Sequence, residues 1–333
     1  MKEYEIRPKK VFDDYLKISE KDIKKYFSNT KKFVDVPCVG CKSSNTDFAF
    51  EKHGFTYKQC KECFTLFASP RPTEDMIDTF YRESESSKFW AKRFFPETAE
   101  ARRMKIFRPR AQLVGEIIGR YDLKKPLILA DAGAGFGIFL EEVKNDGMFD
   151  KVIGIEPSTD LAQTCVTKGF TVIKKPAEKI DDNELQASVI CSFEVLEHLF
   201  DPDRFIAGLA RITQPGGLLL ITTLTISGID LQVLWNDSKS ISPPHHLNFP
   251  SVEGLKAIIE RCGLEEIEIC TPGKLDVDII KNTMRDNPGL QVPRFIEYLI
   301  NNRDQETLAQ MQQFLQANNL SSHARIVARK RSS

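Results

Sequence analysis

The chain has 333 residues, of which 41% are hydrophobic and 28% charged, and its 47 basic residues balance its 47 acidic residues. This length and apolar content favour about two folded domains and argue against extended disorder, and the zero net charge argues against nucleic acid as the main partner. The first residues lack an apolar signal core and no apolar run approaches the ~20 residues of a membrane span, so we expect a cytoplasmic protein without membrane contacts.

The first 70 residues predict a charged segment followed by a small metal module. Residues 1–32 carry ten Lys or Arg against six Asp or Glu, which fits a short charged helix. Within residues 33–70, 18 residues separate two Cys-x-x-Cys pairs, formed by Cys38, Cys41, Cys60 and Cys63. This spacing is typical of four thiolates that close on one Zn²⁺, and a site with four protein ligands is structural. Redox disulfides are the alternative.

The pattern of residues 71–124 predicts a helical linker that forms part of a substrate-binding site. Thr73, followed by two acids, fits a helix start, and Pro96 and Pro109 fit first helical positions. Eight Lys or Arg occupy residues 88–110 beside several aromatic residues. This stretch either binds a phosphorylated substrate or forms a solvated basic helix face. We predict that the substrate is contacted by three residues of this region, Tyr81, Arg103 and Arg110.

From residue 125 to 333 the pattern alternates between strands and helices. Strands are expected over 127–130, 151–155, 171–173, 187–191, 218–223, 265–270 and 323–328. Such alternation indicates an α/β fold with a mostly parallel sheet covered by helices. Residues 275–320 have a helical pattern and are too long for a simple connection, so we expect a helical insertion there.

A glycine loop, Asp131-Ala-Gly-Ala-Gly-Phe-Gly137, follows the first of these strands and precedes a helix. Glycine permits the sharp turn and lets the backbone approach a ligand closely. Gly133, Gly135 and Gly137 occupy every second position, which differs from the spacing in NAD-binding loops. The next strand ends at Glu156-Pro157, 23 residues after Gly133, where a carboxylate can accept hydrogen bonds from a ribose. An ordinary tight turn is the alternative.

The loop and Glu156 resemble the cofactor-binding residues of class I S-adenosylmethionine (SAM)-dependent methyltransferases. Three later segments are also similar to that family: Pro176-Ala-Glu178, Ser192-Phe-Glu-Val-Leu-Glu-His198 and the turn Gln214-Pro-Gly-Gly-Leu218. The resemblance implies a Rossmann-like seven-stranded sheet with strand order 3-2-1-4-5-7-6. It also implies SAM as cofactor, bound by Asp131, Gly133, Gly135, Gly137, Glu156, Pro157, Ala177, Glu178, Phe193 and Glu194.

Methyl transfer to a hydroxyl or a carbon acid needs a proton acceptor, and histidine suits that role near neutral pH. Our first candidates are His245 and His246, in the segment Ser242-Pro-Pro-His-His-Leu-Asn-Phe249, and His198 comes next. Hydrogen bonding within the loop or support of the cofactor pocket are the alternative roles. We add Asn248, in the same segment, to the substrate contacts.

The segment 242–249 is similar to one in zinc-ribbon methyltransferases that modify sugars and natural products. The resemblance implies C- or O-methylation of a small molecule, such as a sugar or nucleotide-sugar, with SAM and structural Zn²⁺ bound. A homo-oligomer is compatible with the sequence. Two alternatives stay open: an RNA or protein methyltransferase that recognises its substrate through the zinc ribbon, and a SAM-binding scaffold without turnover.

Overall fold

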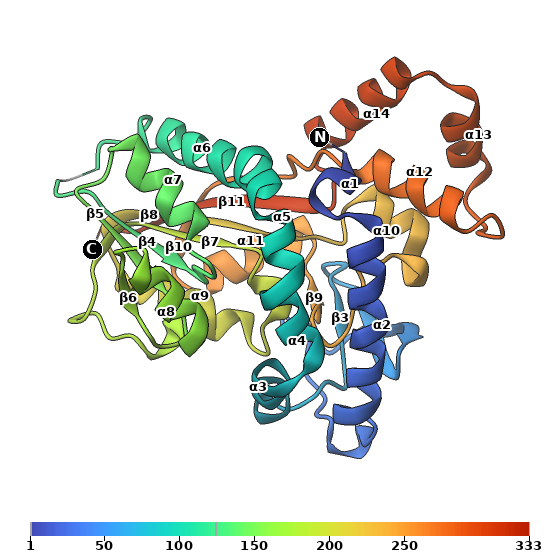
Figure 1. Ribbon diagram of the computed structural model, residues 1–333, viewed down its shortest axis with the longest axis horizontal. Helices are drawn as coiled ribbons and strands as arrows, with labels where there is room; N and C mark the ends of the chain where they lie inside the picture. The colour runs from blue at the N-terminus through green and yellow to red at the C-terminus, as the bar shows by residue number, and fades with distance from the viewer. Residues whose placement is uncertain (1, 124, 333) are drawn as a thin grey trace. The chain divides into compact units, whose positions relative to one another are not determined.

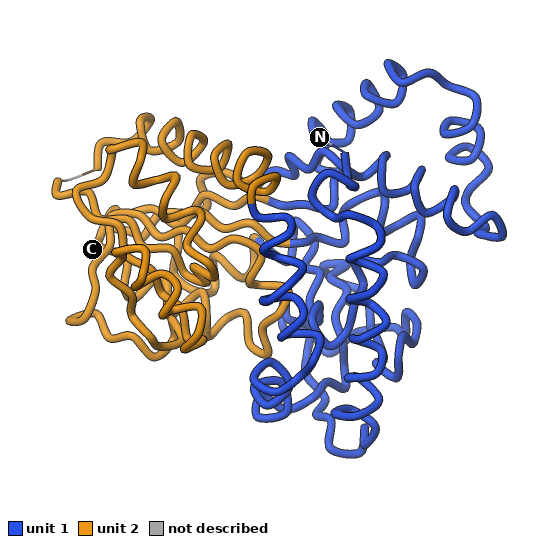
Figure 2. The backbone as a smooth tube through the Cα atoms, viewed as in Figure 1, with its two compact units in different colours: residues 1–99, 224–255, 270–324 blue, residues 100–223, 256–269, 325–333 orange. Residues whose placement is uncertain are grey.

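The computed structural model describes residues 2–123 and 125–332. Met1, Lys124 and Ser333, at the ends of the predicted segments 1–32, 71–124 and 125–333, lie outside the described residues. The chain forms two compact units, and each is assembled from three separate stretches of sequence (Figure 2). Unit 1 comprises residues 1–99, 224–255 and 270–324, and unit 2 comprises residues 100–223, 256–269 and 325–333.

Unit 2 is built on a seven-stranded sheet. Its strands are β4 (Ile128–Ala132), β5 (Lys151–Ile155), β6 (Thr171–Ile173), β7 (Ala187–Phe193), β8 (Thr213–Leu224), β10 (Leu264–Cys270) and β11 (His323–Lys330). The order across the sheet is β10-β11-β8-β7-β4-β5-β6. Counted along the chain, this is the predicted order 3-2-1-4-5-7-6, so the predicted fold class is confirmed.

The central strands of this sheet are parallel, as their apolar runs predict. Strand β4 pairs with β5 on one side and with β7 on the other, and β7 pairs with β8. Helices α6 (Arg108–Ile118) and α7 (Ile138–Asp146) lie beside each other along the sheet (Figure 1). Their buried side chains, such as Val114 and Phe139, pack on Leu129 and Val189 of the strands and form the core of the unit.

The segment Gln214–Gly217, predicted as a turn before the fifth strand, belongs to β8 in the structure. Ala187 pairs with Thr213, but Val189 pairs with Leu218, so β8 accommodates extra residues in a bulge. Gly216 has a φ of 77°, which a residue with a side chain rarely adopts. The glycines therefore shape a bulge inside a long strand, and the strand starts earlier than we predicted.

The remaining helices of unit 2 are α8 (Thr159–Thr167), α9 (Pro202–Ile212) and the short 3-10 helices Ala177–Lys179 and Leu196–His198. Helix α11 (Val252–Arg261) begins in unit 1 and ends in unit 2. Pro96 and Pro109 are the second residues of α5 (Phe95–Arg102) and α6, next to the predicted first position. Each follows a π-helical turn, Trp90–Phe94 or Arg103–Phe107, within a helical stretch. A proline removes one backbone donor and clashes with the preceding turn, and a wider π-turn accommodates this.

Unit 1 contains a second sheet of four strands, built around the cysteine pairs. It has the order β1-β2-β3-β9 and is formed by β1 (Thr46–Lys52), β2 (Phe55–Cys60), β3 (Leu66–Ala68) and β9 (Asn248–Phe249). The first three strands come from the predicted metal module. The fourth comes from the predicted histidine loop, nearly 180 residues later, and no local sequence pattern predicts this pairing.

Unit 1 also contains most of the helices. They are α1 (Glu3–Ile6), α2 (Lys9–Tyr26), α3 (Glu74–Glu83), α4 (Glu85–Phe89), α5 (Phe95–Arg102), α10 (Ile229–Leu234), α12 (Asp276–Asp286), α13 (Arg294–Asn302) and α14 (Gln305–Ala317), with 3-10 turns at Thr30–Lys32 and Trp235–Asp237. Of these, α5 begins in unit 1 and ends in unit 2. Helix α3 starts after Thr73, as predicted. The last three helices occupy the predicted insertion and share one apolar core. Among the described residues, the helices lack the combination of length and apolar character that crossing a bilayer requires.

Candidate functional site

The glycine loop follows β4 and turns sharply into α7. Gly133, Gly135 and Gly137 have φ values of 88°, 54° and 71°, in the left-handed region that favours glycine. A Cβ atom on Gly133 would lie 2.7 Å from Cγ2 of Val195, and one on Gly137 would lie 2.9 Å from Sγ of Cys165. The backbone conformation therefore favours glycine at all three positions, and close packing also requires it at Gly133 and Gly137.

Glu156 follows β5 and is hydrogen-bonded to this loop. Its Oε2 accepts from the amide of Gly135 at 2.8 Å, and its Oε1 accepts from the amide of Ser158 at 2.9 Å. Burial raises the pKa of Glu156, while the two amide hydrogen bonds lower it. A carboxylate offers about four acceptor positions, so each oxygen retains one for a hydroxyl. The loop and Glu156 thus fit a nucleoside with its ribose at the carboxyl ends of β4 and β5.

Asp131, the first residue of the predicted loop, lies within β4 and is buried. Burial raises its pKa to about 7; the charge of Arg110 opposes this shift, and the charge of Glu156 adds to it. Burial therefore disfavours the ionised form of the Asp131 carboxyl group. Such perturbed acids are common at functional sites.

At the end of β7, Glu194 lies beside Arg110. Oε1 of Glu194 accepts hydrogen bonds from Nη2 of Arg110 at 2.9 Å and from Oγ1 of Thr222 at 2.6 Å. The Arg110 guanidinium also lies 4.7 Å from the ring centroid of Phe193. Glu194 has a φ of 56°, an uncommon conformation for a residue with a side chain, and such strain often occurs at functional sites. The structure therefore brings Arg110, a predicted substrate contact, together with two predicted cofactor residues.

Glu197 is a site candidate that the sequence analysis missed. It is buried in the short helix Leu196–His198, and its Oε2 accepts from Oγ1 of Thr223 at 2.9 Å. Burial, followed by the charge of Glu194, raises the pKa of Glu197 to about 8. A signal was present, because Glu197 is the second acid of the segment that resembles the methyltransferase family. His198 ends the same short helix in unit 2.

The predicted adenine segment lies in the 3-10 helix Ala177–Lys179. Ala177 is buried, and the backbone oxygen of Glu178 accepts from Arg211 at 2.8 Å. The Glu178 side chain lies 3.4 Å from Nη2 of Arg204, on α9. Pro157 follows Glu156 and is exposed. These contacts fix the segment next to α9, and its predicted contact with adenine stays a prediction.

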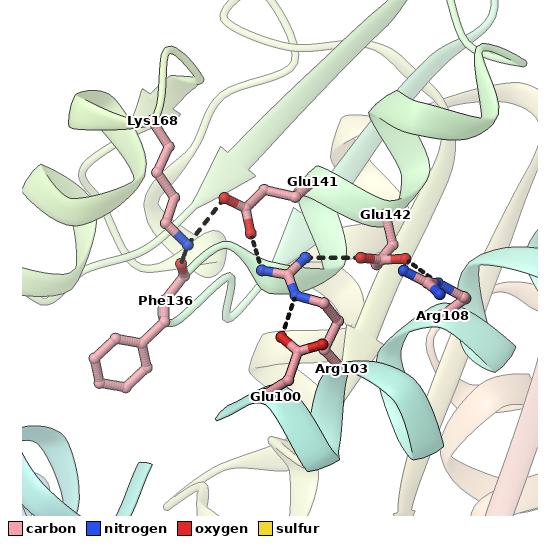
Figure 3. A network of polar contacts seen from close by, with 7 residues as sticks. All are labelled: Glu100, Arg103, Arg108, Phe136, Glu141, Glu142 and Lys168. Carbon is pink, nitrogen blue, oxygen red and sulfur yellow. Dashed lines mark hydrogen bonds and ion pairs between the residues drawn. The ribbon is translucent and has the colours of Figure 1, made fainter. Parts of the chain in front are cut away.

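A network of charged side chains connects the glycine loop to the predicted acceptor region (Figure 3). Lys168 donates to the backbone oxygen of Phe136 at 2.8 Å and pairs with Glu141 at 3.2 Å. Arg103 donates to Glu141 at 2.6 Å and to Glu142 at 2.7 Å. Arg103 was predicted to bind substrate. That role stays a prediction, and these ion pairs favour a structural role.

The histidine loop lies in unit 1, and its two histidines have different surroundings. His245 is buried, with its ring 5.1 to 5.8 Å from the rings of Tyr15, Phe80 and Tyr81. Nδ1 of His246 lies 2.6 Å from the backbone oxygen of Ser240. Since a carbonyl oxygen only accepts, Nδ1 of His246 carries the proton, and in the neutral ring Nε2 is then the basic nitrogen.

Two predicted substrate contacts occur near these histidines. Tyr81 packs its ring against His245, with centroids 5.5 Å apart, and 37% of the residue is exposed. Asn248 is fully buried, and its Oδ1 accepts from Nη2 of Arg71 at 2.9 Å. The position of Tyr81 is compatible with its predicted role. The burial of Asn248 favours a structural role.

The four predicted metal ligands converge in unit 1. The Sγ atoms of Cys38 and Cys63 lie 3.5 Å apart, as do those of Cys41 and Cys60, and all four lie within 4.8 Å of one another. Tetrahedral Zn²⁺ with bonds of ~2.3 Å separates its sulfur ligands by about 3.8 Å. The residues present therefore fit a Zn²⁺ ion.

The two cysteine turns share one backbone geometry. Lys42 donates its amide to the oxygen of Cys38 at 2.8 Å, and Phe64 donates its amide to the oxygen of Cys60 at 3.0 Å. Both residues have positive φ values, 66° and 61°. Each turn thereby directs its two thiols to the same point, and four thiolate ligands would leave no coordination position for a substrate.

Comparisons with curated proteins find methyltransferases. The ubiquinone biosynthesis O-methyltransferase of Methylococcus capsulatus is 34% identical over 104 residues, which cover 29% of this chain and 43% of that protein. The corresponding mitochondrial protein of Dictyostelium discoideum is 27% identical, with 37% and 44% covered. The tRNA U34 carboxymethyltransferase of Pseudoalteromonas translucida is 31% identical, with 42% and 45% covered. The chain thus spans less than half the length of these relatives.

Among solved structures, the plantazolicin methyltransferase BpumL in complex with S-adenosylhomocysteine (SAH) has a similar fold. The TM-score is 0.50 at 13% sequence identity, and the match covers 77% of this chain and 94% of that one. Residues 99–269, more than half of the chain, match the sequence family described as "Methyltransferase domain". This range contains the glycine loop, Glu156, Glu194 and Glu197, and the chain belongs to the methyltransferase-domain family.

Proposed function

We propose that this chain transfers the methyl group of SAM to a small-molecule acceptor. The observation that carries the proposal is the glycine loop bound to Glu156, in which three residues with positive φ adjoin a buried carboxylate that retains acceptor capacity. The family match and the strand order support the same cofactor. When bound, SAM supplies an electrophilic methyl group on a sulfonium.

The residues that would hold SAM are those of unit 2. The backbone of Gly133, Gly135 and Gly137 would approach the cofactor closely, and Glu156 would accept hydrogen bonds from the ribose hydroxyls. Ala177 and Glu178 would line the adenine, and Phe193 and Glu194 lie at the end of the adjacent strand β7. Arg110 pairs with Glu194 there and offsets its negative charge.

For the acceptor we propose a hydroxyl or carbon acid, with a sugar or nucleotide-sugar as the first class to test. The resemblance of segment 242–249 to sugar-modifying enzymes supports this class. The curated relatives from Methylococcus and Dictyostelium are O-methyltransferases by name, which supports an oxygen acceptor. A phenolic hydroxyl belongs in the same acceptor panel, because those relatives are named for ubiquinone biosynthesis.

We propose His246 as the residue that removes the acceptor proton. Its Nδ1–H donates to the oxygen of Ser240, which fixes the tautomer with a basic Nε2. Donation to a backbone oxygen also orients the ring, as a positioned base requires. His245 packs among three aromatic rings, which suits the orientation of an acceptor or of the loop. His198 remains a secondary candidate.

The test is transfer of a labelled methyl group from SAM to a panel of nucleotide-sugars, free sugars and phenols. We expect product with one acceptor class and a loss of kcat of about 10²–10⁴-fold in His246→Asn, because Asn keeps a donor near the position of Nδ1 and lacks the basic nitrogen. His53→Asn is the control, since His53 lies in the β1–β2 turn, where its φ of 52° suits Asn. Full activity of His246→Asn would exclude His246 as the base.

An RNA acceptor is the second candidate, supported by the relative named tRNA U34 carboxymethyltransferase. Adding bulk tRNA to the panel separates the two classes, since RNA binding should weaken steeply with salt. SAH binding without methyl transfer to any acceptor or to cell extract would instead support the scaffold alternative.

A further inference from the structure

The cysteine module and the histidine loop are parts of one sheet. Strand β3, between the second cysteine pair and Arg71, is antiparallel to β9 of the histidine loop, with Leu66 opposite Phe249 and Phe67 opposite Asn248. The amide of Ala68 donates to the oxygen of Leu247 at 2.8 Å, which continues the pairing toward His246. The backbone on one side of His246 is therefore held by the strand that follows the metal ligands.

Two buried side chains, one in the module and one just after it, add to this attachment. The hydroxyl of Tyr57 donates to the backbone oxygen of His246 at 2.7 Å. Arg71 donates through Nη2 to Oδ1 of Asn248 and through Nε to the oxygen of Ala68, each at 2.9 Å. Tyr57 and Arg71 are fully buried. A buried donor that loses its partner is destabilising, so these bonds favour a single loop position.

The far end of the loop contacts the metal ligands themselves. Ser251 donates through Oγ to the backbone oxygen of Cys63, and its amide donates to Oγ1 of Thr65 at 3.2 Å. The same Oγ1 lies 3.2 Å from Sγ of Cys63. On the other cysteine turn, a Cβ on Gly40 would lie 2.9 Å from Cα of Gly254. Both cysteine turns thus touch the chain just after the histidine loop.

We propose that the cysteine module positions the histidine loop, so that metal loading keeps His246 in place for proton removal. This inference rests on the proposed function of His246. The module is small, and its two turns are connected through the four thiols, so metal binding supplies much of the free energy that folds it. Loss of the metal would loosen β3 and Thr65 and, through them, residues 242–251. The glycine loop and Glu156 belong to the other compact unit.

The first experiment compares hydrogen exchange in the zinc-loaded protein and after removal of the metal by a chelator, with zinc content measured by elemental analysis. We expect amide exchange in the peptide 242–251 to accelerate about tenfold or more without metal and to recover when zinc is added back. The affinity for SAH, measured by calorimetry, should change by less than about twofold. Unchanged exchange in this peptide after confirmed metal loss would overturn the proposal.

A point variant tests the positioning without disturbing the metal. Tyr57→Phe removes only the hydroxyl that donates to the oxygen of His246. We expect faster exchange of peptide 242–251, a kcat lowered about tenfold, an unchanged KM for SAM and an unaltered zinc content. Tyr26→Phe, a tyrosine on α2 of the same unit, should match the parent. Normal exchange and normal kcat in Tyr57→Phe would contradict the positioning role.

These outcomes separate the positioning role from the function on which it depends. Exchange that responds to zinc, in a protein that methylates no acceptor, would support the attachment and reject the proposed function. Methyl transfer at the same rate with and without zinc would support the function and reject the positioning role.

Discussion

The amide of Gly135 donates a hydrogen bond of 2.8 Å to Oε2 of Glu156, a residue 21 positions later in the chain. The bond joins the ends of two adjacent parallel strands, β4 and β5. It fixes the carboxylate against the glycine loop and leaves acceptor capacity on the oxygen. A cofactor whose ribose reaches Glu156 would thus contact a loop whose shape depends on the same side chain.

Gly133→Ala should destroy the cofactor site more than it destabilises the fold. The new Cβ would lie 2.7 Å from Val195 in a residue with a φ of 88°. We expect SAH affinity to fall by more than about tenfold and unfolding free energy to fall by about 1–3 kcal/mol. Gly147→Ala is the matched control, because its φ is 66° and its Cβ would meet no atom within 4 Å. Parental SAH affinity in Gly133→Ala would rule out a cofactor at this loop.

Arg103→Met should lower stability without changing the KM for the acceptor. Arg103 bridges Glu141 and Glu142, and the side chain of Glu142 is only 5% exposed, so its removal leaves a buried acid with one fewer partner. We expect a loss of roughly 1–3 kcal/mol in urea unfolding. Arg93→Met, which breaks an exposed pair with Glu97, should cost less than about 1 kcal/mol. A raised acceptor KM at unchanged stability would instead support the predicted role of Arg103 in substrate binding.

Glu197→Gln should make stability less sensitive to pH. Burial and then Glu194 raise the pKa of Glu197 to about 8, whereas the unfolded chain loses this proton near ~4.3. Between these values the folded protein binds more protons, so this group lowers stability as pH rises. The Tm of the variant relative to the parent should therefore increase from pH 5 to pH 8. A constant difference in Tm across this range would show that the pKa of Glu197 is not raised.

The sequence predicted the sheet of unit 2 well because each strand is a short apolar run between helices. Strand β5 was placed within its observed bounds, and β4 and β7 were extended by only two residues each beyond their predicted ends. The glycine loop and Glu156 were found because the ends of adjacent parallel strands bring them together, which the strand order implies. Local patterns were sufficient wherever the chemistry lies at consecutive strand ends.

Features that depend on distant contacts were not predictable. Asn248 pairs with Phe67 across β3 and β9, and no local pattern marks a strand of two residues. Arg103 has the same charge whether it binds a phosphate or two glutamates, and only the fold reveals Glu141 and Glu142 beside it. Pro109 lies in the first turn of α6, close to the predicted helix start, but the π-turn Arg103–Phe107 that precedes it has no local signature in the sequence.

The central claim is that the loop and Glu156 bind SAM, and titration calorimetry with SAH tests it most directly. We predict one SAH bound per chain, and an affinity about 10–100-fold lower in Glu156→Gln, which has no charge to strengthen the hydroxyl hydrogen bonds. Glu184→Gln, at an exposed glutamate of the same unit that pairs with Lys175, should bind like the parent. Absence of SAH binding to the parent, or equal affinity in the parent and Glu156→Gln, would contradict the account.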